Sequence, residues 1–353
     1  MRAVSSAANV IFAGKLLIEK GRDLKIVHII FTDNFAGSER HCADLANAQD
    51  ENGDDVYLVL MRQTKKPSIS DHLRPGVTIL ELNWFQRRLG LARTISTISP
   101  DIIHAHLGRA ARALQNIDCP SVGTLHVKYK AKDHDHLDGI ICLNEAQEGR
   151  LAHLDCNKAV IGNWVTPYPE PDMAFVNAER ARLNISDNAF TFGYMGRLNA
   201  PKNVDLLISA FKDMPRNTHL MIVGDGEERR ALEALAGDDA RITFLGVRSD
   251  VGNCYAMMDC LVLPSRNEGF PLVLGEAMRL GCPIISSETE GALSCLPKGA
   301  PFFAVGDRQG LIAHMHDELR KGRRRMTYDT RHLKREVQVE KIKSFYNSVI
   351  RAS

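Results

Sequence analysis
Short apolar runs recur along the chain and alternate with segments of helical spacing. Residues 25–31 are almost free of polar side chains, whereas residues 39–52 place Cys42, Leu45 and Ala46 at helical spacing. Strands that are apolar on both faces and are separated by helices are typical of a parallel sheet covered on both sides. We therefore expect a doubly wound α/β unit in the first half. Its expected strands are residues 25–31, 55–60, 101–106, 121–126 and 139–143.

The alternation stops and then starts again. Residues 166–187 carry Pro167, Pro169 and Pro171 with few apolar anchors, which is typical of a linker. A second series follows, and the 353 residues exceed what one core usually supports. Its expected strands are residues 190–195, 219–223, 242–245, 260–263 and 283–286, with helices at 204–211, 227–235 and 272–280. We predict an extension of unknown role (1–23), a first domain (24–165), the linker (166–187), a second domain (188–330) and a terminal helical segment (331–353).

Composition excludes several functional classes. The net charge of +2 gives no reason to expect nucleic acid as a partner. The eight cysteines are scattered, with no pair at metal-ligand spacing, which favours a reduced, cytoplasmic compartment. No apolar run reaches the ~18 residues of a membrane-spanning helix. A signal peptide is disfavoured because the positive region at the start is a single arginine.

Two carboxylates flank a strand-to-helix transition at residues 261–278. An apolar strand leads into Glu268, Gly269 and Pro271, and Glu276 follows in the expected helix. Open parallel sheets bind ligands at such transitions, and the first amides of the helix accept phosphate oxygens. The alternative is that both carboxylates are exposed and merely complement the helix dipole, which is worth ~0.3–1 kcal/mol.

Cations and glycines follow other strands of the second series. Gly196 ends a strand and is followed by Arg197 and Lys202, which suit the two phosphates of a nucleotide diphosphate. The alternative is a pair of solvated surface cations. Glycines also close the next two strands, at Gly224 and at Gly246, the latter followed by Arg248. Tight turns alone would explain such glycines.

Polar groups follow strands of the first series as well, and they predict a second group of site residues at one edge of the first sheet. Gly37 lies in the motif Phe-Ala-Gly-Ser-Glu-Arg (residues 35–40), which opens a helix. His104, His106 and His126 stand at the ends of expected strands. A single strand-end histidine is more often structural than catalytic, but strand ends on one edge converge.

In their order and spacing, these motifs resemble the retaining glycosyltransferases of family 4, which have the GT-B fold. The match runs through the second domain and ends in the Glu-x7-Glu pair, and it is looser in the first domain, where Ala36 replaces a glycine of the family's Gly-Gly-x-Glu loop. The resemblance implies two Rossmann-like domains facing across a cleft, with a C-terminal helix that crosses back to the first.

The resemblance also implies roles for individual residues. Glu276 would bind the ribose and Glu268 the transferred sugar, while Arg197 and Lys202 would stabilise the diphosphate. The amides of Phe270, Leu272 and Val273 would cradle sugar hydroxyls and phosphate, and the loop of Gly246 and Arg248 would line the base. Gly37 would approach the distal phosphate, and His126 would hydrogen bond the donor sugar. The residues expected to bind the donor or act on it are Gly37, His126, Gly196, Arg197, Lys202, Gly224, Gly246, Arg248, Glu268, Gly269, Phe270, Leu272, Val273 and Glu276.

The implied activity is retaining transfer of a hexosyl group from a nucleotide-diphosphate sugar to a glycan or lipid-linked acceptor in cell-envelope polysaccharide or lipopolysaccharide synthesis. The alternatives are another GT-B reaction, such as that of a nucleotide-sugar 2-epimerase or a phosphorylase, and a non-catalytic sugar-nucleotide-binding scaffold. No metal cofactor is expected, and Asp133–His136 is interpreted as a polar loop. Aromatic residues and arginines in residues 84–93 raise the hypothesis of peripheral contact with the cytoplasmic face of the inner membrane, against an ordinary amphipathic helix.

Overall fold

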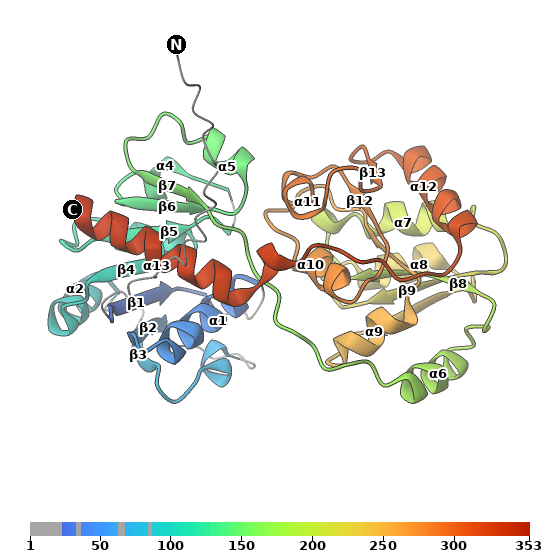
Figure 1. Cartoon of the computed structure of the whole chain (residues 1–353), viewed down its shortest axis with the longest axis horizontal. Helices are drawn as coiled ribbons and strands as arrows, with labels where there is room; N and C mark the ends of the chain where they lie inside the picture. Colours follow the sequence, from blue (N-terminus) through green and yellow to red (C-terminus); the bar gives the residue numbers. More distant parts are fainter. Residues whose placement is uncertain (1–22, 33–36, 63–67, 84–86, 127) are drawn as a thin grey trace, which may run out of the picture.

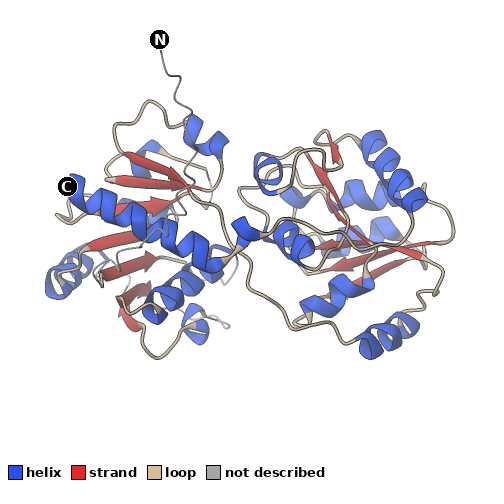
Figure 2. Ribbon diagram, in the orientation of Figure 1, coloured by secondary structure: helices blue, strands red, loops and turns tan. Residues whose placement is uncertain are grey.

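The computed structural model describes residues 23–32, 37–62, 68–83, 87–126 and 128–353. It has two lobes, and each lobe is built on a parallel β-sheet with helices on both faces (Figures 1 and 2). Figure 1 shows the first lobe, mainly blue to green, beside the second, mainly yellow to orange, with the red C-terminal helix lying on the first lobe. The predicted tandem of doubly wound sheets is therefore confirmed. The expected extension, residues 1–23, lies almost entirely outside the described residues.

The first sheet has seven strands in the order β3-β2-β1-β4-β5-β6-β7, and all pairs are parallel. Its strands are β1 (Lys25–Ile30), β2 (Asp55–Met61), β3 (Thr78–Leu82), β4 (Ile102–His106), β5 (Ser121–Thr124), β6 (Gly139–Cys142) and β7 (Asn157–Val160). The chain begins in the middle, moves out to β3 and returns beside β1. The strand order therefore reverses between β1 and β4, where open parallel sheets form ligand crevices.

Helices and short helical turns cover this sheet. They are α1 (Gly37–Glu51), η1 (Ile69–His72), α2 (Arg87–Ile98), α3 (Gly108–Ala113), α4 (Ala131–His134) and α5 (Glu145–Gly149). The sequence analysis missed the edge strands β3 and β7. Most of their residues are exposed or half-buried, so neither gives the continuous apolar signal of a central strand.

The second sheet has six strands in the order β10-β9-β8-β11-β12-β13. They are β8 (Phe190–Met195), β9 (Thr218–Val223), β10 (Ile242–Gly246), β11 (Cys260–Leu263), β12 (Ile284–Ser287) and β13 (Phe302–Phe303). Every residue of β8 is buried, as expected for a central strand with helices on both faces. The strand order reverses between β8 and β11, which places the loops after these two strands at the second crevice.

The helices of the second lobe carry the site residues or support them. They are η3 (Ala200–Lys202), α7 (Val204–Phe211), α8 (Arg229–Ala236), α9 (Val251–Met257), α10 (Leu272–Arg279), α11 (Glu290–Cys295) and α12 (Arg308–Lys321). Residues 166–187, predicted as a linker, contain helix α6 (Met173–Arg182). Its Val176 is buried in the core of the second lobe.

The C-terminal segment crosses from the second lobe to the first, as Figure 1 shows. It consists of η4 (Arg331–Leu333) and α13 (Arg335–Ala352). Leu333 packs into the core of the second lobe, whereas α13 buries Ile342, Phe345 and Tyr346 against the first sheet. The helix expected to cross back is therefore confirmed, and it brings side chains from the end of the chain to the centre of the first sheet.

Candidate active site
A cavity of about 350 Å³ lies between the two lobes. The first lobe contributes residues of α1 and His72 of η1, and the second contributes the loop after β10 and the start of α10. Residues 164–168 close it from the side of the linker. Its lining residues are Arg40, His41, Ala43, Asp44, His72, Trp164, Val165, Thr166, Tyr168, Arg248, Ser249, Val251, Leu272 and Glu276.

Glu276 is the acidic group that α10 contributes to this cavity. It is buried, with 7% of its surface exposed. The Tyr168 hydroxyl donates to Oε1 at 2.7 Å, and the Tyr255 hydroxyl lies 3.0 Å both from Oε2 and from the Val273 carbonyl oxygen, between which it shares its proton. Burial and the nearby carboxylate raise the pKa of both phenols, so they remain hydrogen-bond donors. The carboxylate is thereby held in a fixed orientation beside the cavity.

Glu268 occupies the loop between β11 and α10. Its Oε1 accepts hydrogen bonds from Lys202 Nζ at 2.6 Å and from Ser265 Oγ at 2.6 Å. The side chains of Lys202 and Glu268 are 26% and 9% exposed. Lys202 and Glu268, which the sequence analysis placed in one site on separate parts of the donor, are thus in direct contact.

Arg197 follows β8 at the crevice of the second sheet. It is exposed, and its side chain makes no ion pair with any other residue in the described ranges. The turn is tight, because a Cβ on Gly224 would stand 1.9 Å from the carbonyl oxygen of Gly196. Gly224 also has a φ of +127°, a conformation that side chains disfavour. Gly196, Gly224 and Gly246 end three neighbouring strands, as predicted.

The loop that carries Gly269 and Phe270 contacts the first lobe. Asn144 Nδ2 donates to the Gly269 carbonyl at 2.9 Å. A Cβ on Gly269 would lie 3.4 Å from the carbonyl oxygen of His126, so the two backbones are close. Leu272 and Val273 begin α10, where helix amides have no partner within the helix. His126 of the first lobe and the predicted phosphate-binding loop of the second therefore meet across the cleft.

Arg248 lines the cavity, but its guanidinium is already engaged. It donates to Asp250 at 2.7 Å and to Glu179 at 2.8 Å. The side-chain hydrogen bonds of Arg182 and Arg248 lower the pKa of Glu179 to about 2. The position of Arg248 fits the predicted base-lining loop, while its charge is largely neutralised by its own neighbours.

The first-lobe motif at residues 35–40 is described from Gly37 onward; Phe35 and Ala36 lie outside the described residues. A Cβ on Gly37 would meet no atom within 4 Å, so open space surrounds it. Arg40 and His41, one and two residues after the motif's glutamate, line the cavity. His41 is 6% exposed, and within the part of the chain that the structure describes its Nε2 has no hydrogen-bond partner.

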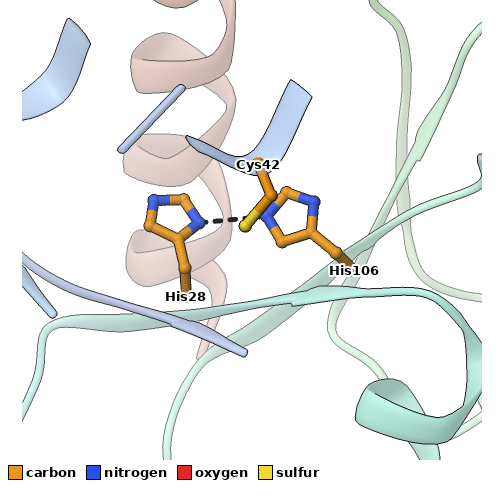
Figure 3. A group of neighbouring side chains, drawn as sticks. All are labelled: His28, Cys42 and His106. Carbon is orange, nitrogen blue, oxygen red and sulfur yellow. Dashed lines mark hydrogen bonds between the residues drawn. The ribbon is translucent and has the colours of Figure 1, made fainter. Parts of the chain in front are cut away.

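The strand-end histidines form one connected group with a histidine that the sequence analysis did not select. His28 Nδ1 lies 3.0 Å from His106 Nε2, and His106 Nδ1 lies 3.1 Å from His126 Nε2. Figure 3 shows the first of these hydrogen bonds, with Cys42 beside it. Burial lowers the pKa of His28 and of His126 to about 4, so both are neutral near pH 7. Burial also places the pKa of His106 well below its usual value.

The segment Asp133–His136, predicted as a polar loop, begins inside helix α4, where Asp133 and His134 are buried. The loop prediction is therefore wrong for these two residues. Asp133 pairs with Arg112, and the His136 ring contacts the Ala111 carbonyl. Elsewhere in the described ranges, ligand atoms of His28, Cys42 and His106 lie within 4.8 Å of one another. These two histidine nitrogens are hydrogen bonded to each other, and burial raises the pKa of Cys42.

Sequence reasoning missed the groups that orient the carboxylates and histidines. Tyr168 lies within the proline-rich segment, and Tyr255 lies in an otherwise ordinary helix. Both reach Glu276 only through the tertiary fold. His28 lies inside an apolar run, and its place directly between Val27 and Ile29 of β1 was the available signal for a buried polar role.

Comparisons with known proteins match both lobes. Residues 35–167 match the model described as Glycosyltransferase Family 4, and residues 189–320 match the model described as Glycosyl transferases group 1. Together the two models span most of the chain. The chain belongs to glycosyltransferase family 4. This family 4 member is therefore an enzyme that transfers glycosyl groups.

A relative of known role and two solved structures agree with this. LpsD, a lipopolysaccharide core biosynthesis glycosyltransferase of Rhizobium meliloti (strain 1021), is 29% identical over 312 residues, which are 82% of this chain and 86% of LpsD. A glycosyltransferase from Rickettsia africae ESF-5 has a TM-score of 0.79 at 15% identity and covers 94% of this chain and 100% of its own. Anabaena HepE in complex with UDP-glucose has a TM-score of 0.74 at 19% identity and covers 93% of this chain and 99% of its own. These similarities confirm the GT-B fold.

In the ranges that the structure describes, no helix combines the length and the apolar character that a bilayer crossing requires.

Proposed function
We propose that this family 4 enzyme moves a hexosyl group from a nucleotide-diphosphate sugar to a glycan or lipid-linked acceptor of the cell envelope, with retention of anomeric configuration. The carrying observation is that Glu276 is oriented by two tyrosine hydroxyls at a cavity between the lobes, while Glu268 and Lys202 lie in the loops at the crevice of the second sheet. The similarity to LpsD over most of both chains supports an envelope glycan as acceptor.

The second lobe supplies the groups for the donor in this proposal. Glu276 accepts hydrogen bonds from the ribose, and the amides at the start of α10 receive phosphate oxygens. Arg197 and Lys202 stabilise the negative charge that grows on the leaving diphosphate, while the sugar passes through an oxocarbenium-like state. The first lobe binds the acceptor, and contact between the lobes excludes water from the reacting centre.

Retention follows, in this proposal, from attack on the same face that the diphosphate leaves. The leaving phosphate takes the proton of the acceptor hydroxyl, and Glu268, held by Lys202 and Ser265, positions the sugar without forming a bond to it. Mass spectrometry of enzyme stopped during turnover tests this step. A glycosyl adduct on any carboxylate would contradict it.

The activity test is a panel of UDP-, GDP- and ADP-hexoses with and without lipid-linked glycan acceptors. We expect one nucleotide class to stabilise the protein thermally and release of the nucleoside diphosphate to depend on the acceptor. Glu268→Ala is expected to abolish transfer while donor binding persists. Consumption of the donor with no acceptor would instead favour an epimerase-type reaction, and binding without turnover would favour a scaffold.

The proposal places the enzyme in the cytoplasm, at the cytoplasmic face of the membrane, and assigns it no metal cofactor. The membrane part rests on residues 84–93. Residues 84–86 lie outside the described residues, and α2 begins at Arg87. Co-sedimentation with anionic liposomes that is unchanged by charge reversal at Arg87 and Arg88 would contradict the membrane contact. To test whether a metal is needed, metal ions are removed exhaustively with a chelator. We expect the enzyme to keep its full activity.

A further inference from the structure
The histidines of the first lobe continue beyond the strand ends to an amide and a phenol. His28 Nε2 lies 2.6 Å from Gln49 Oε1, and the Gln49 amide nitrogen donates to the Tyr346 hydroxyl at 3.4 Å. Gln49 comes from α1 and Tyr346 from the crossing helix α13, and both are at most 1% exposed. A continuous set of hydrogen bonds therefore runs from the C-terminal helix to His126 in the cleft.

The position of each proton in this network follows from Gln49. Its Oε1 can only accept, so His28 Nε2 carries a proton and Nδ1 offers a lone pair. The His106 Nε2–H then donates to that lone pair, and the His126 Nε2–H donates to His106 Nδ1. Each ring is neutral, so each has one proton to give. This leaves His126 with an unprotonated Nδ1.

A second branch starts at the Gln49 amide nitrogen. The Tyr346 hydroxyl accepts from Gln49 and therefore sends its own proton to His104 Nδ1, 2.6 Å away. His104 Nε2 then donates to Thr124 Oγ1 at 2.7 Å. Rotating the amide by 180° would reverse every proton in both branches. One side chain therefore decides the polarity of the whole network.

We propose that Gln49 sets the tautomer of His126 through His28 and His106, so that His126 presents Nδ1 as an acceptor for a hydroxyl of the donor sugar. This rests on the proposed function, in which His126 contacts the donor. His126 is half-buried, and its backbone lies against Gly269 of the phosphate-binding loop. Gln49, His28 and His106 are then positioning residues that never touch the substrate.

The first arm of the test reads protonation directly and needs no turnover. The full-length protein with ¹⁵N-labelled histidine is measured by long-range ¹H–¹⁵N NMR near pH 7.5. We expect His126, assigned from the spectrum of His126→Asn, to be neutral with the proton on Nε2. Gln49→Met removes the anchor and should change that tautomer, whereas Gln49→Glu keeps an acceptor for His28 and should preserve it. A proton on Nδ1, or a tautomer insensitive to Gln49→Met, would overturn the proposal.

The second arm uses modified donors of the nucleotide class found in the panel. Each sugar hydroxyl remote from the anomeric carbon is replaced in turn by hydrogen or by fluorine. Fluorine accepts hydrogen bonds but cannot donate them, so at one position both replacements should lower kcat/KM by about tenfold. If His126 were a donor, the fluorine compound would be used normally, and the proposal would be wrong.

The variants His106→Phe and His104→Gln form the matched pair for that arm. Phenylalanine keeps the ring of His106, which stacks on His104 and His126, but breaks the hydrogen bonds. We expect His106→Phe to use the natural donor and its deoxy and fluoro analogues at that hydroxyl with similar kcat/KM. His104→Gln, which changes only the other branch, should keep the preference for the natural donor. Equal effects of the two variants would indicate a merely structural role. Stoichiometric zinc in the native protein, lost in Cys42→Ala, would also overturn the relay, because a metal on His28 Nδ1 excludes the His106 proton.

If the donor panel detects no transfer, the NMR arm still decides the tautomer, and the proposed function fails on its own. If transfer occurs but the tautomer is reversed, only the relay fails.

Discussion
The two walls of the cleft solve the problem of a buried polar site in different ways. On the second-lobe side, carboxylates are paired with a cation or with hydroxyl donors, as in Lys202–Glu268 and Tyr168–Glu276. On the first-lobe side, histidines contact one another and remain neutral because burial lowers their pKa. The charged groups of the second lobe, the charged wall, suit a leaving diphosphate. The buried histidines of the first lobe, the neutral wall, can orient sugar hydroxyls without adding charge to a cleft that Arg40 and Asp44 also line. The predictions below test whether this contrast is real.

The largest effect is expected at the charged wall. Lys202→Ala should lower kcat by about 10²- to 10³-fold, because a positioned charge is lost where charge develops. Lys212→Ala removes an exposed lysine of the same lobe and serves as the control. Transfer assays under saturating donor give both values.

Lys202→Ala leaves the Glu268 carboxylate with Ser265 as its remaining hydrogen-bond partner among the described residues. The loss of activity could come from the missing charge at the diphosphate or from the unpaired Glu268 carboxylate. The double variant Lys202→Ala/Glu268→Gln separates these two causes. If the neutral amide restored activity, the loss would come from an unpaired carboxylate, and Lys202 would not act on the diphosphate.

The neutral wall predicts acid sensitivity. His28 has a pKa of about 4 in the folded protein against 6.5 in the unfolded chain, and its side chain is fully buried. The unfolded state therefore binds the proton first, so stability is complete above pH 6.5 and falls as the pH drops toward 4. The loss for His28 alone is roughly 3 kcal/mol.

Urea unfolding between pH 7.5 and 4.5 measures this loss through the fluorescence of Trp164, whose ring lies 4.5 Å from that of His41. A Trp84→Phe background leaves Trp164 as the single tryptophan signal. The variant His28→Gln should flatten the pH dependence. An equally steep dependence in that variant would mean that other groups control acid stability.

The hydroxyls around Glu276 should affect donor binding more than turnover. Tyr168→Phe and Tyr255→Phe each remove a hydrogen bond to a buried carboxylate, which is worth about 1.5–3 kcal/mol. We expect the KM for the donor to rise by about tenfold or more with kcat little changed. Tyr328→Phe, whose hydroxyl contacts a backbone carbonyl, is the control. A fall in kcat with unchanged KM would place Glu276 at the reacting centre instead of the ribose.

Local patterns were enough to predict the charged wall but not the neutral one. The strand β11 (Cys260–Leu263) was predicted to the residue, and Glu268 and Glu276 follow it within one strand-to-helix unit. The neutral wall depends on Gln49 and Tyr346, which are 297 residues apart and meet only after α13 has crossed back. Neither residue carries a local signal of its role. Packing between distant segments decided which histidine nitrogens have partners.

The proline-rich segment shows the same limit on a smaller scale. Its composition predicted a linker between two sheets, yet α6 lies within it and Tyr168 reaches Glu276 from it. Both features depend on contacts with the second lobe that composition does not encode.

The smallest effect is expected where the two walls meet in solvent. Arg150 of the first lobe pairs with Glu290 of the second at 2.9 Å, and their side chains are 55% and 46% exposed. Exposed pairs of this kind contribute about 0–1 kcal/mol, because water screens the charges and both side chains lose freedom. A double-mutant cycle with Arg150→Ala and Glu290→Ala should give a coupling in that range, and it should shrink further in high salt. Asn144→Ala removes a neutral contact between the lobes and is the salt-insensitive control. If the same cycle, measured on kcat, gave a large and salt-dependent coupling, the Arg150–Glu290 pair would control closure of the cleft. Contact between the two walls would then matter more for catalysis than the difference in charge between them.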